Sequence, residues 1–423
     1  MLVSLRLLAL FPILVLRLPL MAVAAACGAC AGIGYTLLTG AEVPTVRSCI
    51  AAILFLVATA IGREAMTLRL VAAGAMIVLL LWPEALAGAS FQLSFAAITA
   101  IVALHDHPAI RRAARSTDDP RFRRGVRSVA LLLLTGVAVE VALAPVALFH
   151  FHRSGLYGAL ANLVAIPLTT FIIMPAGAGA LLLDSIGAGA PLWWVAEGGI
   201  TLLLGLSRIV AEAPGAVAMV PVMPLPALSL MVGGGLWLLL WRRRPRWLGL
   251  PVIVAGALIA ASAPAPDIIV TGDGRHMAIQ TDEGRPALLR ARTGSYVRDQ
   301  MASGLGEEPL ALTPLDALPG ARCTRDVCTV DLATGKASHR IAAIRSAYRL
   351  PWREIVSLCA GVDYIVSDRQ LPRACAPRRL KIDPVLLSRT GGLAIDLRHG
   401  TIRTVRASRS DHPWVQPARP GVQ

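Results

Sequence analysis

Long apolar runs separated by short polar connections occupy the first 263 residues of the chain. A membrane-spanning helix needs about 20 predominantly apolar residues, so this stretch has room for about nine such helices with their loops. We place the runs at residues 9–38, 48–61, 70–82, 90–104, 125–150, 158–182, 191–212, 225–241 and 248–263. The second, third and fourth runs are short for a full crossing, which predicts kinked or re-entrant segments there.

The pattern changes after residue 263. Ala263-Pro264-Ala265-Pro266 has the composition of a linker, and short alternating runs with turn signals between them follow. Such runs occur at Asp267–Val270, Met277–Gln280 and Leu393–Leu397. The sequence therefore predicts a polytopic α-helical membrane domain over residues 1–263 and a soluble mixed α/β domain over residues 264–423.

Composition supports this division. Of all residues 55% are hydrophobic and 16% charged, and the mean hydropathy is +0.63, which excludes a purely soluble or disordered protein. Residues 1–263 carry 18 Lys/Arg and 10 Asp/Glu, whereas the shorter remainder carries 23 and 16. The net charge of +15 suits anionic lipid or nucleic acid as a partner, although positive loops alone account for much of it.

The arginines of the short loops predict the orientation in the membrane. Residues 105–124 and 242–246 are the most basic connections, and four predicted spans separate them, so both can lie in the cytoplasm. This arrangement puts the N-terminus in the cytoplasm. With nine spans, it puts residues 264–423 on the extracytoplasmic side of the membrane.

The seven cysteines divide between the two parts of the chain. Cys27, Cys30 and Cys49 lie in apolar runs, where packing of small residues is favoured over redox chemistry. The other four lie in the predicted outside domain, where an even number indicates two disulfides. The local pairing, Cys323 with Cys328 and Cys359 with Cys375, is one of three possible pairings, and a four-thiolate zinc site is the alternative.

Polar residues inside the apolar runs are the candidates for a transport path, because such residues are costly unless they face a helix or water. Gln92 and Ser94 lie at the start of the fourth run, and helix–helix hydrogen bonding is an equal alternative for them. A second block places an ionisable residue within a span, a basic cluster at the predicted outer mouth, and residues that interrupt the next helix. These residues are Glu140, then His150, His152 and Arg153, then Asn162 and Pro167. A proline-kinked packing helix is the alternative to a broken helix that lines the path.

Three segments resemble the ComEC family of competence proteins, in the order of that family: Tyr35–Arg47, Phe91–Phe95 and Phe149–Pro167, with Pro214–Ala216 as a further match. The resemblance implies a channel in the bacterial inner membrane that passes single-stranded DNA into the cytoplasm during natural transformation. A DNA receptor outside and a helicase-like motor inside are the implied protein partners, and a homo-oligomer is one possible assembly. Two alternatives remain: a small-molecule or ion transporter, and a truncated remnant that transports nothing.

Residues 264–423 resemble the degenerate metallo-β-lactamase-type domain that follows the channel in many members. This resemblance rests on Asp267–Val270 with Gly272–Gly274, on the Cys323–Cys328 pair, and on the segment from Cys359 to Asp383. The clustered His-x-His-x-Asp-His run that holds two metal ions in a catalytic domain of this class is missing from the sequence. His276, His339, His399 and His412 are isolated. We therefore expect no enzymatic activity, no metal and no cofactor. The chain also begins after the N-terminal part that the family usually carries.

For a single-stranded polyanion, the sequence predicts a wet, weakly basic path with low-affinity contacts. Arg153 with His150 and His152 would receive phosphates at the outer mouth, and Gln92, Ser94 and Asn162 would offer uncharged donors. Glu140 and Glu197 do not fit easily, because carboxylates repel DNA. Protonation, pairing with arginine and proton coupling all remain open for these two residues.

Overall fold

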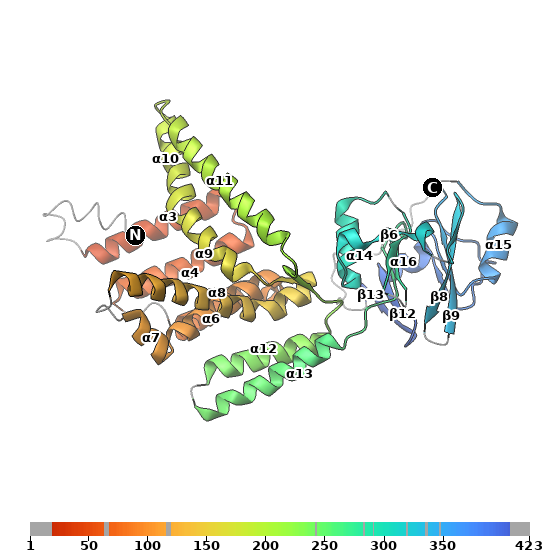
Figure 1. Cartoon of the computed structure of the whole chain (residues 1–423), viewed down its shortest axis with the longest axis horizontal. Helices are drawn as coiled ribbons and strands as arrows, with labels where there is room; N and C mark the ends of the chain where they lie inside the picture. Colours follow the sequence, from red (N-terminus) through yellow and green to blue (C-terminus); the bar gives the residue numbers. More distant parts are fainter. Residues whose placement is uncertain are drawn as a thin grey trace. The chain divides into compact units, whose positions relative to one another are not determined.

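The computed structural model describes residues 19–62, 67–115, 120–241, 243–281, 284–290, 292–318, 320–334, 337–346 and 348–406 (Figure 1). The chain divides into two compact units. The first comprises Met1–His150, Ser154–Ala218 and Leu228–Gly256, and the second comprises Phe151–Arg153, Met219–Ala227 and Ala257–Gln423. The domain boundary at residues 263/264 stays a prediction.

The first unit is helical, and each of the nine predicted apolar runs contributes a helix. The helices are α3 (Leu20–Leu38), α4 (Val43–Ala60), α5 (Leu68–Leu81), α6 (Ala89–His105), α7 (Pro108–Arg115), α8 (Arg121–Phe151), α9 (Gly158–Leu168), α10 (Met174–Asp184), α11 (Ala190–Ala211), α12 (Leu225–Leu240) and α13 (Gly249–Ala261). Residues 9–18 of the run 9–38 lie outside the described residues.

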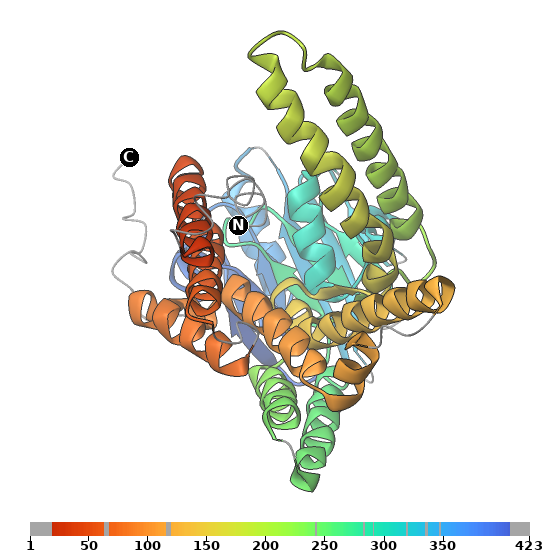
Figure 2. The same cartoon turned by 90° about the vertical axis from the view of Figure 1, so that its left-hand side faces the viewer.

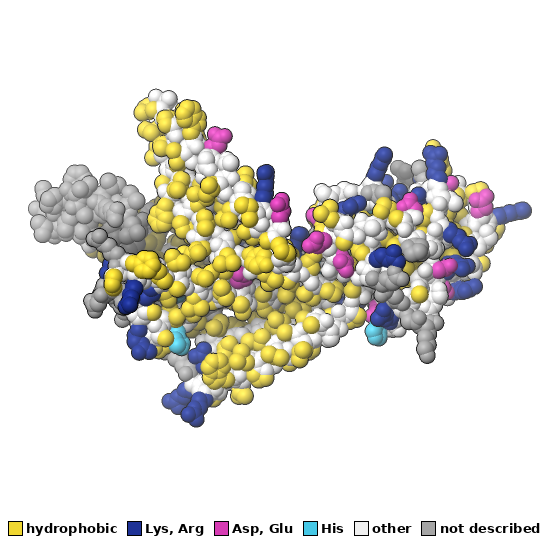
Figure 3. Space-filling view, in the orientation of Figure 1, with side chains coloured by type: hydrophobic (Ala, Val, Ile, Leu, Met, Phe, Trp, Pro, Cys, Tyr) yellow, Lys and Arg dark blue, Asp and Glu magenta, His cyan; other side chains and the backbone are white. Residues whose placement is uncertain are grey.

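Within the described residues, five helices are long and apolar enough to cross a membrane. The count is six if α6 and α7, which meet at a 76° bend, form one broken span, and α4, α5 and α12 are shorter apolar helices. The number of nine spans therefore stays a prediction. Large apolar side chains such as Leu80, Phe171 and Trp194 are exposed on these helices. Figure 3 shows apolar side chains covering the helical unit, as expected for a surface in contact with lipid.

The helix after residue 157 is continuous, which corrects the expectation of an interrupted one. Pro167 lies one residue before the end of α9, and a π-helical turn over Thr169–Ile173 (η2) joins α9 to α10. The helix continues through Pro167 and the π-turn into α10, so the missing backbone donor of proline does not end it. The whole segment Gly158–Asp184 is one candidate span. Figure 2 shows α10 beside α11, and Gly199 of α11 allows Ile173 to approach closely.

The second unit contains two β-sheets, which confirms the predicted mixed α/β character. The six-stranded sheet has the order β13-β12-β3-β4-β5-β6, and the five-stranded sheet has the order β11-β10-β9-β8-β7. The first sheet comprises β3 (Ile268–Val270), β4 (Met277–Gln280), β5 (Pro286–Leu288), β6 (Thr313–Pro314), β12 (Leu393–Asp396) and β13 (Thr401–Thr404). The second comprises β7 (Arg322–Cys323), β8 (Val327–Thr334), β9 (Ala337–Ile344), β10 (Tyr364–Val366) and β11 (Leu380–Ile382).

The two sheets share one core, which includes Ile268, Ile279, Val330, Ile341 and Ile395. Helix α14 (Ser295–Leu305) covers the outer face of the six-stranded sheet through Met301 and Leu305, and α15 (Trp352–Ala360) covers the other sheet through Cys359. The layers are therefore helix, sheet, sheet and helix (Figure 1). A short helix, α16 (Pro384–Thr390), begins at the buried Asp383, whose carboxylate accepts the amide of Leu386.

The predicted local cysteine pairs are present as disulfides in this unit. Cys323 and Cys328 are cross-strand partners on β7 and β8, with Cα atoms 4.0 Å apart. Cys359 at the end of α15 is joined to Cys375, with Cα atoms 5.2 Å apart. Cys27, Cys30 and Cys49 are free thiols.

Candidate functional site

Arg47 is a buried cation near the N-terminal end of α4. Its side chain lies in an apolar unit with only 6% of its surface exposed, and its guanidinium donates to the hydroxyl of Ser90 at the start of α6. A buried charge is expensive unless it is paired or hydrogen-bonded, and the Ser90 hydroxyl supplies such a bond to Arg47. Arg47 also lines a cavity of about 220 Å³ between α4, α5 and α6, whose other walls are almost entirely apolar.

Gln92 on α6 and His150 on α8 form a second contact between helices. The side-chain amide oxygen of Gln92 lies 3.0 Å from Nε2 of His150, and its amide nitrogen donates to the carbonyl of Leu86 at 2.9 Å. Leu86 belongs to a 3₁₀ turn, η1 (Pro83–Ala87), that leads into α6. With Nε2 protonated, the imidazole donates to the amide oxygen. The structure thus brings together two of the predicted path residues.

Glu140 holds the start of the next helix. Its carboxylate accepts the backbone amides of Gly158 at 3.1 Å and of Ala159 at 2.9 Å. These amides are among the first donors of α9, which have no partner within their own helix, and a helix N-terminus favours negative charge. Gly158 permits the approach, because a Cβ there would lie 3.2 Å from the carboxylate. The N-terminus of α9 therefore offsets the negative charge of the Glu140 carboxylate. The sequence did not suggest this arrangement.

The connection after α8 carries the predicted basic cluster, and the division between the two units falls inside it. His150 belongs to the first unit and Phe151–Arg153 to the second. His152 has a positive φ of 58°, its Nδ1 is buried without a hydrogen-bond partner in the described part of the chain, and burial lowers its pKa. Arg153 is exposed in the short strand β1 (Arg153–Gly155), which pairs with β2 (Val217–Met219).

The remaining predicted residues do not join these contacts. Ser94 is half-buried on α6, Asn162 is exposed on α9, and Glu197 is exposed on α11. Their roles in a transport path stay predictions. Arg47 and Ser90 were missed as site residues, although Arg47 closes the first matched segment. An arginine near the start of an apolar helix was the signal that marked it.

Comparison with known proteins places these contacts in a family. A family model described as "Competence protein" matches residues 1–245, more than half of the 423 residues. The chain belongs to the competence protein family. The matched region contains Arg47, Ser90, Gln92, Glu140 and His150, so all three sets of contacts lie inside the competence family region.

One curated relative of this competence protein is ComE operon protein 3 of Bacillus subtilis (strain 168). It is 23% identical over 154 residues, which represent 36% of this chain and 18% of that protein. The match therefore spans less than a fifth of the relative's length. No solved structure matches the chain significantly. Family membership and the apolar helices together identify a membrane protein of the ComEC type.

Proposed function

We propose that the first unit forms part of an inner-membrane channel that passes single-stranded DNA into the cytoplasm during natural transformation. The observation that carries the proposal is the buried Arg47, hydrogen-bonded to Ser90 and lining a cavity between apolar helices. A polyanion needs a few weak cationic contacts within the bilayer rather than a tight site. A buried arginine among apolar helices supplies one such contact.

The carboxylate of Glu140 is compatible with an anionic cargo in this arrangement. Its charge faces the backbone amides of Gly158 and Ala159, so the helix terminus offsets its repulsion of phosphate. His150 and Gln92 present polar groups on the same set of helices. These residues support a path that holds DNA loosely and leaves it free to move.

Further proposals concern the second unit and the orientation. Its layers of helix, sheet, sheet and helix support a degenerate metallo-β-lactamase-like fold, and its two disulfides support an extracytoplasmic location, where disulfides persist. Among the described residues, no three His, Cys, Asp or Glu side chains form a group able to hold a metal ion. We propose that this unit is not a metal-dependent nuclease. Zinc- or manganese-dependent cleavage of DNA by the purified full chain would contradict this.

The test of the channel is DNA import in cells that carry single variants at the chromosomal locus. We expect Arg47→Gln to lower transformation frequency at least tenfold at an unchanged protein level, and Arg47→Lys to restore part of it. Arg69→Gln is the matched control, since Arg69 is exposed on the neighbouring α5 and should be neutral. Equal transformation by all variants would refute the role of Arg47. A saturable small-molecule flux in vesicles, with import unaffected by deletion of the gene, would favour the transporter instead.

A further inference from the structure

Four loops of the second unit meet at one edge of its two sheets. Strands β9 and β10 are parallel, so their carboxyl ends lie together, and the pairing of β5 with β4 and of β4 with β3 places the end of β5 beside the β3–β4 turn. We call the described residues of these loops the loop edge: residues 271–276, 289–290, 292–294, 345–346, 348–351 and 367–370. Residues 291 and 347 lie outside the described part.

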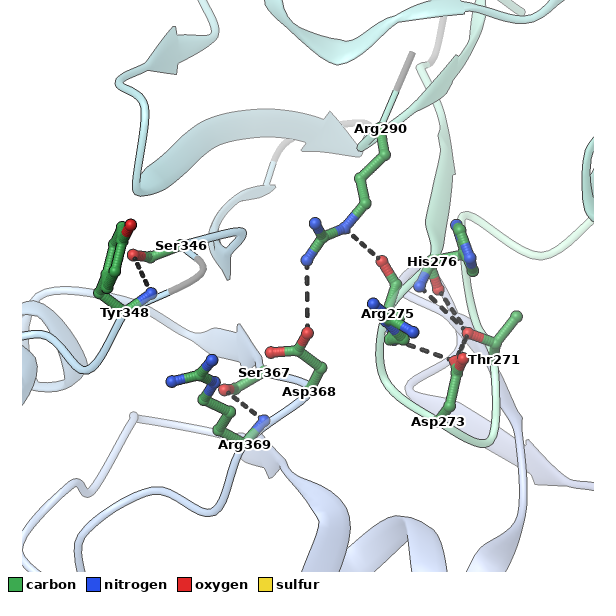
Figure 4. A network of polar contacts seen from close by, with 10 residues as sticks. All are labelled: Thr271, Asp273, Arg275, His276, Arg290, Ser346, Tyr348, Ser367, Asp368 and Arg369. Atoms are coloured by element: carbon green, nitrogen blue, oxygen red, sulfur yellow. Dashed lines mark hydrogen bonds and ion pairs between the residues drawn. The ribbon is translucent and has the colours of Figure 1, made fainter. Parts of the chain in front are cut away.

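Side-chain and backbone contacts join the loops across the two sheets. Arg290, after β5, donates to the carbonyl of Arg275 at 2.9 Å and to the carboxylate of Asp368, after β10, at 3.4 Å (Figure 4). Gly274 lies against Ser367, because a Cβ there would be 2.6 Å from the carbonyl oxygen of Ser367. These contacts join three of the four loops, and the parallel pairing of β9 with β10 places the fourth, which follows β9, beside the loop that follows β10.

The loop edge is strongly basic. It carries six arginines and two aspartates: Arg275, Arg290, Arg292, Arg345, Arg349 and Arg369, with Asp273 and Asp368. Both carboxylates are engaged within the surface, since Asp273 accepts the Thr271 hydroxyl and the Arg275 amide while Asp368 pairs with Arg290. Four of the six arginines are exposed, namely Arg275, Arg292, Arg349 and Arg369. Guanidinium forks match the geometry of phosphate.

Exposed aromatic side chains border the same loops. The described residues from 257 to 406 contain four aromatic residues, of which Tyr364 is buried in the core. The other three are Tyr296, Tyr348 and Trp352, with 74%, 75% and 60% of their surfaces exposed. Tyr348 lies within a loop of the edge, Trp352 follows that loop directly, and Tyr296 begins α14 after the loop 289–294. Three exposed rings therefore border the basic loops, and exposed apolar groups gathered at one place mark interaction sites.

We propose that the loop edge binds single-stranded nucleic acid, with the arginines contacting phosphates while Tyr348 and Trp352 stack on bases. The choice of single-stranded DNA as ligand rests on the proposed function of the chain. Basic surfaces with aromatic platforms recognise single strands in this way, because unpaired bases offer their faces for stacking. A duplex keeps its bases stacked on each other and would gain only the phosphate contacts.

The experiment uses the full chain in nanodiscs of neutral lipid and a fluorescent oligothymidine, with binding followed by anisotropy. We expect Tyr348→Ala to weaken binding about 5- to 150-fold, the usual effect of losing one stacked base, and Tyr348→Phe to preserve it. Arg349→Gln should reduce the magnitude of the salt slope by about 0.7 for each lost phosphate contact. Arg379→Gln, an exposed arginine that directly precedes β11 at the opposite end of the strands from these loops, should match the unaltered protein.

Three results would overturn the proposal: no binding of oligothymidine by the unaltered protein, full binding by both Tyr348→Ala and Trp352→Ala, or equal weakening by Tyr348→Ala and Tyr348→Phe. A fourth contrary result is a loss of duplex binding in Tyr348→Ala as large as the loss of single-strand binding. These outcomes are independent of the import assay with Arg47 variants. Failure of the loop edge can therefore be distinguished from failure of the proposed channel.

Discussion

Removal of the Glu140 carboxylate should loosen the start of α9. Glu140→Ala leaves the amides of Gly158 and Ala159 without their acceptor, and each buried donor left unsatisfied costs about 1–3 kcal/mol. Because both Glu140 and Gly158 are only half-buried, water recovers part of this loss, and we expect about 2–3 kcal/mol in total. Glu140→Gln keeps one acceptor oxygen and should lose about 1 kcal/mol.

The assay is reversible unfolding of the full chain in mixed micelles, with transformation frequency measured in parallel. Glu197→Ala is the matched control, because it removes an exposed carboxylate from α11, and it should leave the unfolding free energy unchanged. The order of stability should be unaltered protein and Glu197→Ala, then Glu140→Gln, then Glu140→Ala. Equal stability of Glu140→Ala and Glu197→Ala would refute the capping role.

Three further predictions concern the second unit. Cys359→Ser opens a disulfide that spans 16 residues and should cost about 3 kcal/mol, measured by denaturant unfolding with and without reductant. Burial, reinforced by two nearby arginines, lowers the pKa of His276 below its ordinary value of 6.5 despite the nearby Asp273. The unfolded state therefore binds more protons than the folded state, and the free energy of unfolding should fall as the pH drops below about 6.5. Thermal melts should show this loss in the unaltered protein and not in His276→Gln. Gly274→Ala should destabilise more than Gly400→Ala in the same melts. Both positions have positive φ, but only Gly274 has a backbone oxygen within contact distance, and equal effects would contradict this.

The sequence predicted the parts of the molecule that depend on local pattern. Apolar runs gave the helices of the first unit, and alternation gave β3, β4 and β12. The local pairing of Cys323 with Cys328 was one of three possibilities, and the neighbouring strands β7 and β8 bring these two residues together. In each case the signal lies within about 20 residues of chain, where helix and strand periods are readable.

The contacts of the candidate site were beyond such patterns. Arg47 and Ser90 are 43 residues apart, and Gln92 and His150 are 58 apart, so only the packing of α4, α6 and α8 brings them together. The sequence suggested that the Glu140 carboxylate would repel DNA. Its partners are the backbone amides of Gly158 and Ala159, and no pattern of side chains marks such partners in a sequence. Pro167 was expected to break the helix because proline usually ends one, whereas this helix continues through it into a π-turn and α10.

The order of strands in the six-stranded sheet has a consequence for the biogenesis of the protein. Strand β12 pairs with β3, and the carboxylate of Asp267 accepts the backbone amide of Leu397. These two residues are 130 positions apart in the sequence. A pairing between such distant segments forms slowly, because closing the long loop between them costs entropy before the contact stabilises the sheet. Until synthesis has passed residue 397, β3 keeps an unpaired edge open to other chains. A ribosome that stops before this point would therefore release an incomplete chain that is prone to aggregation. Quality-control proteases would then determine how much of this chain accumulates.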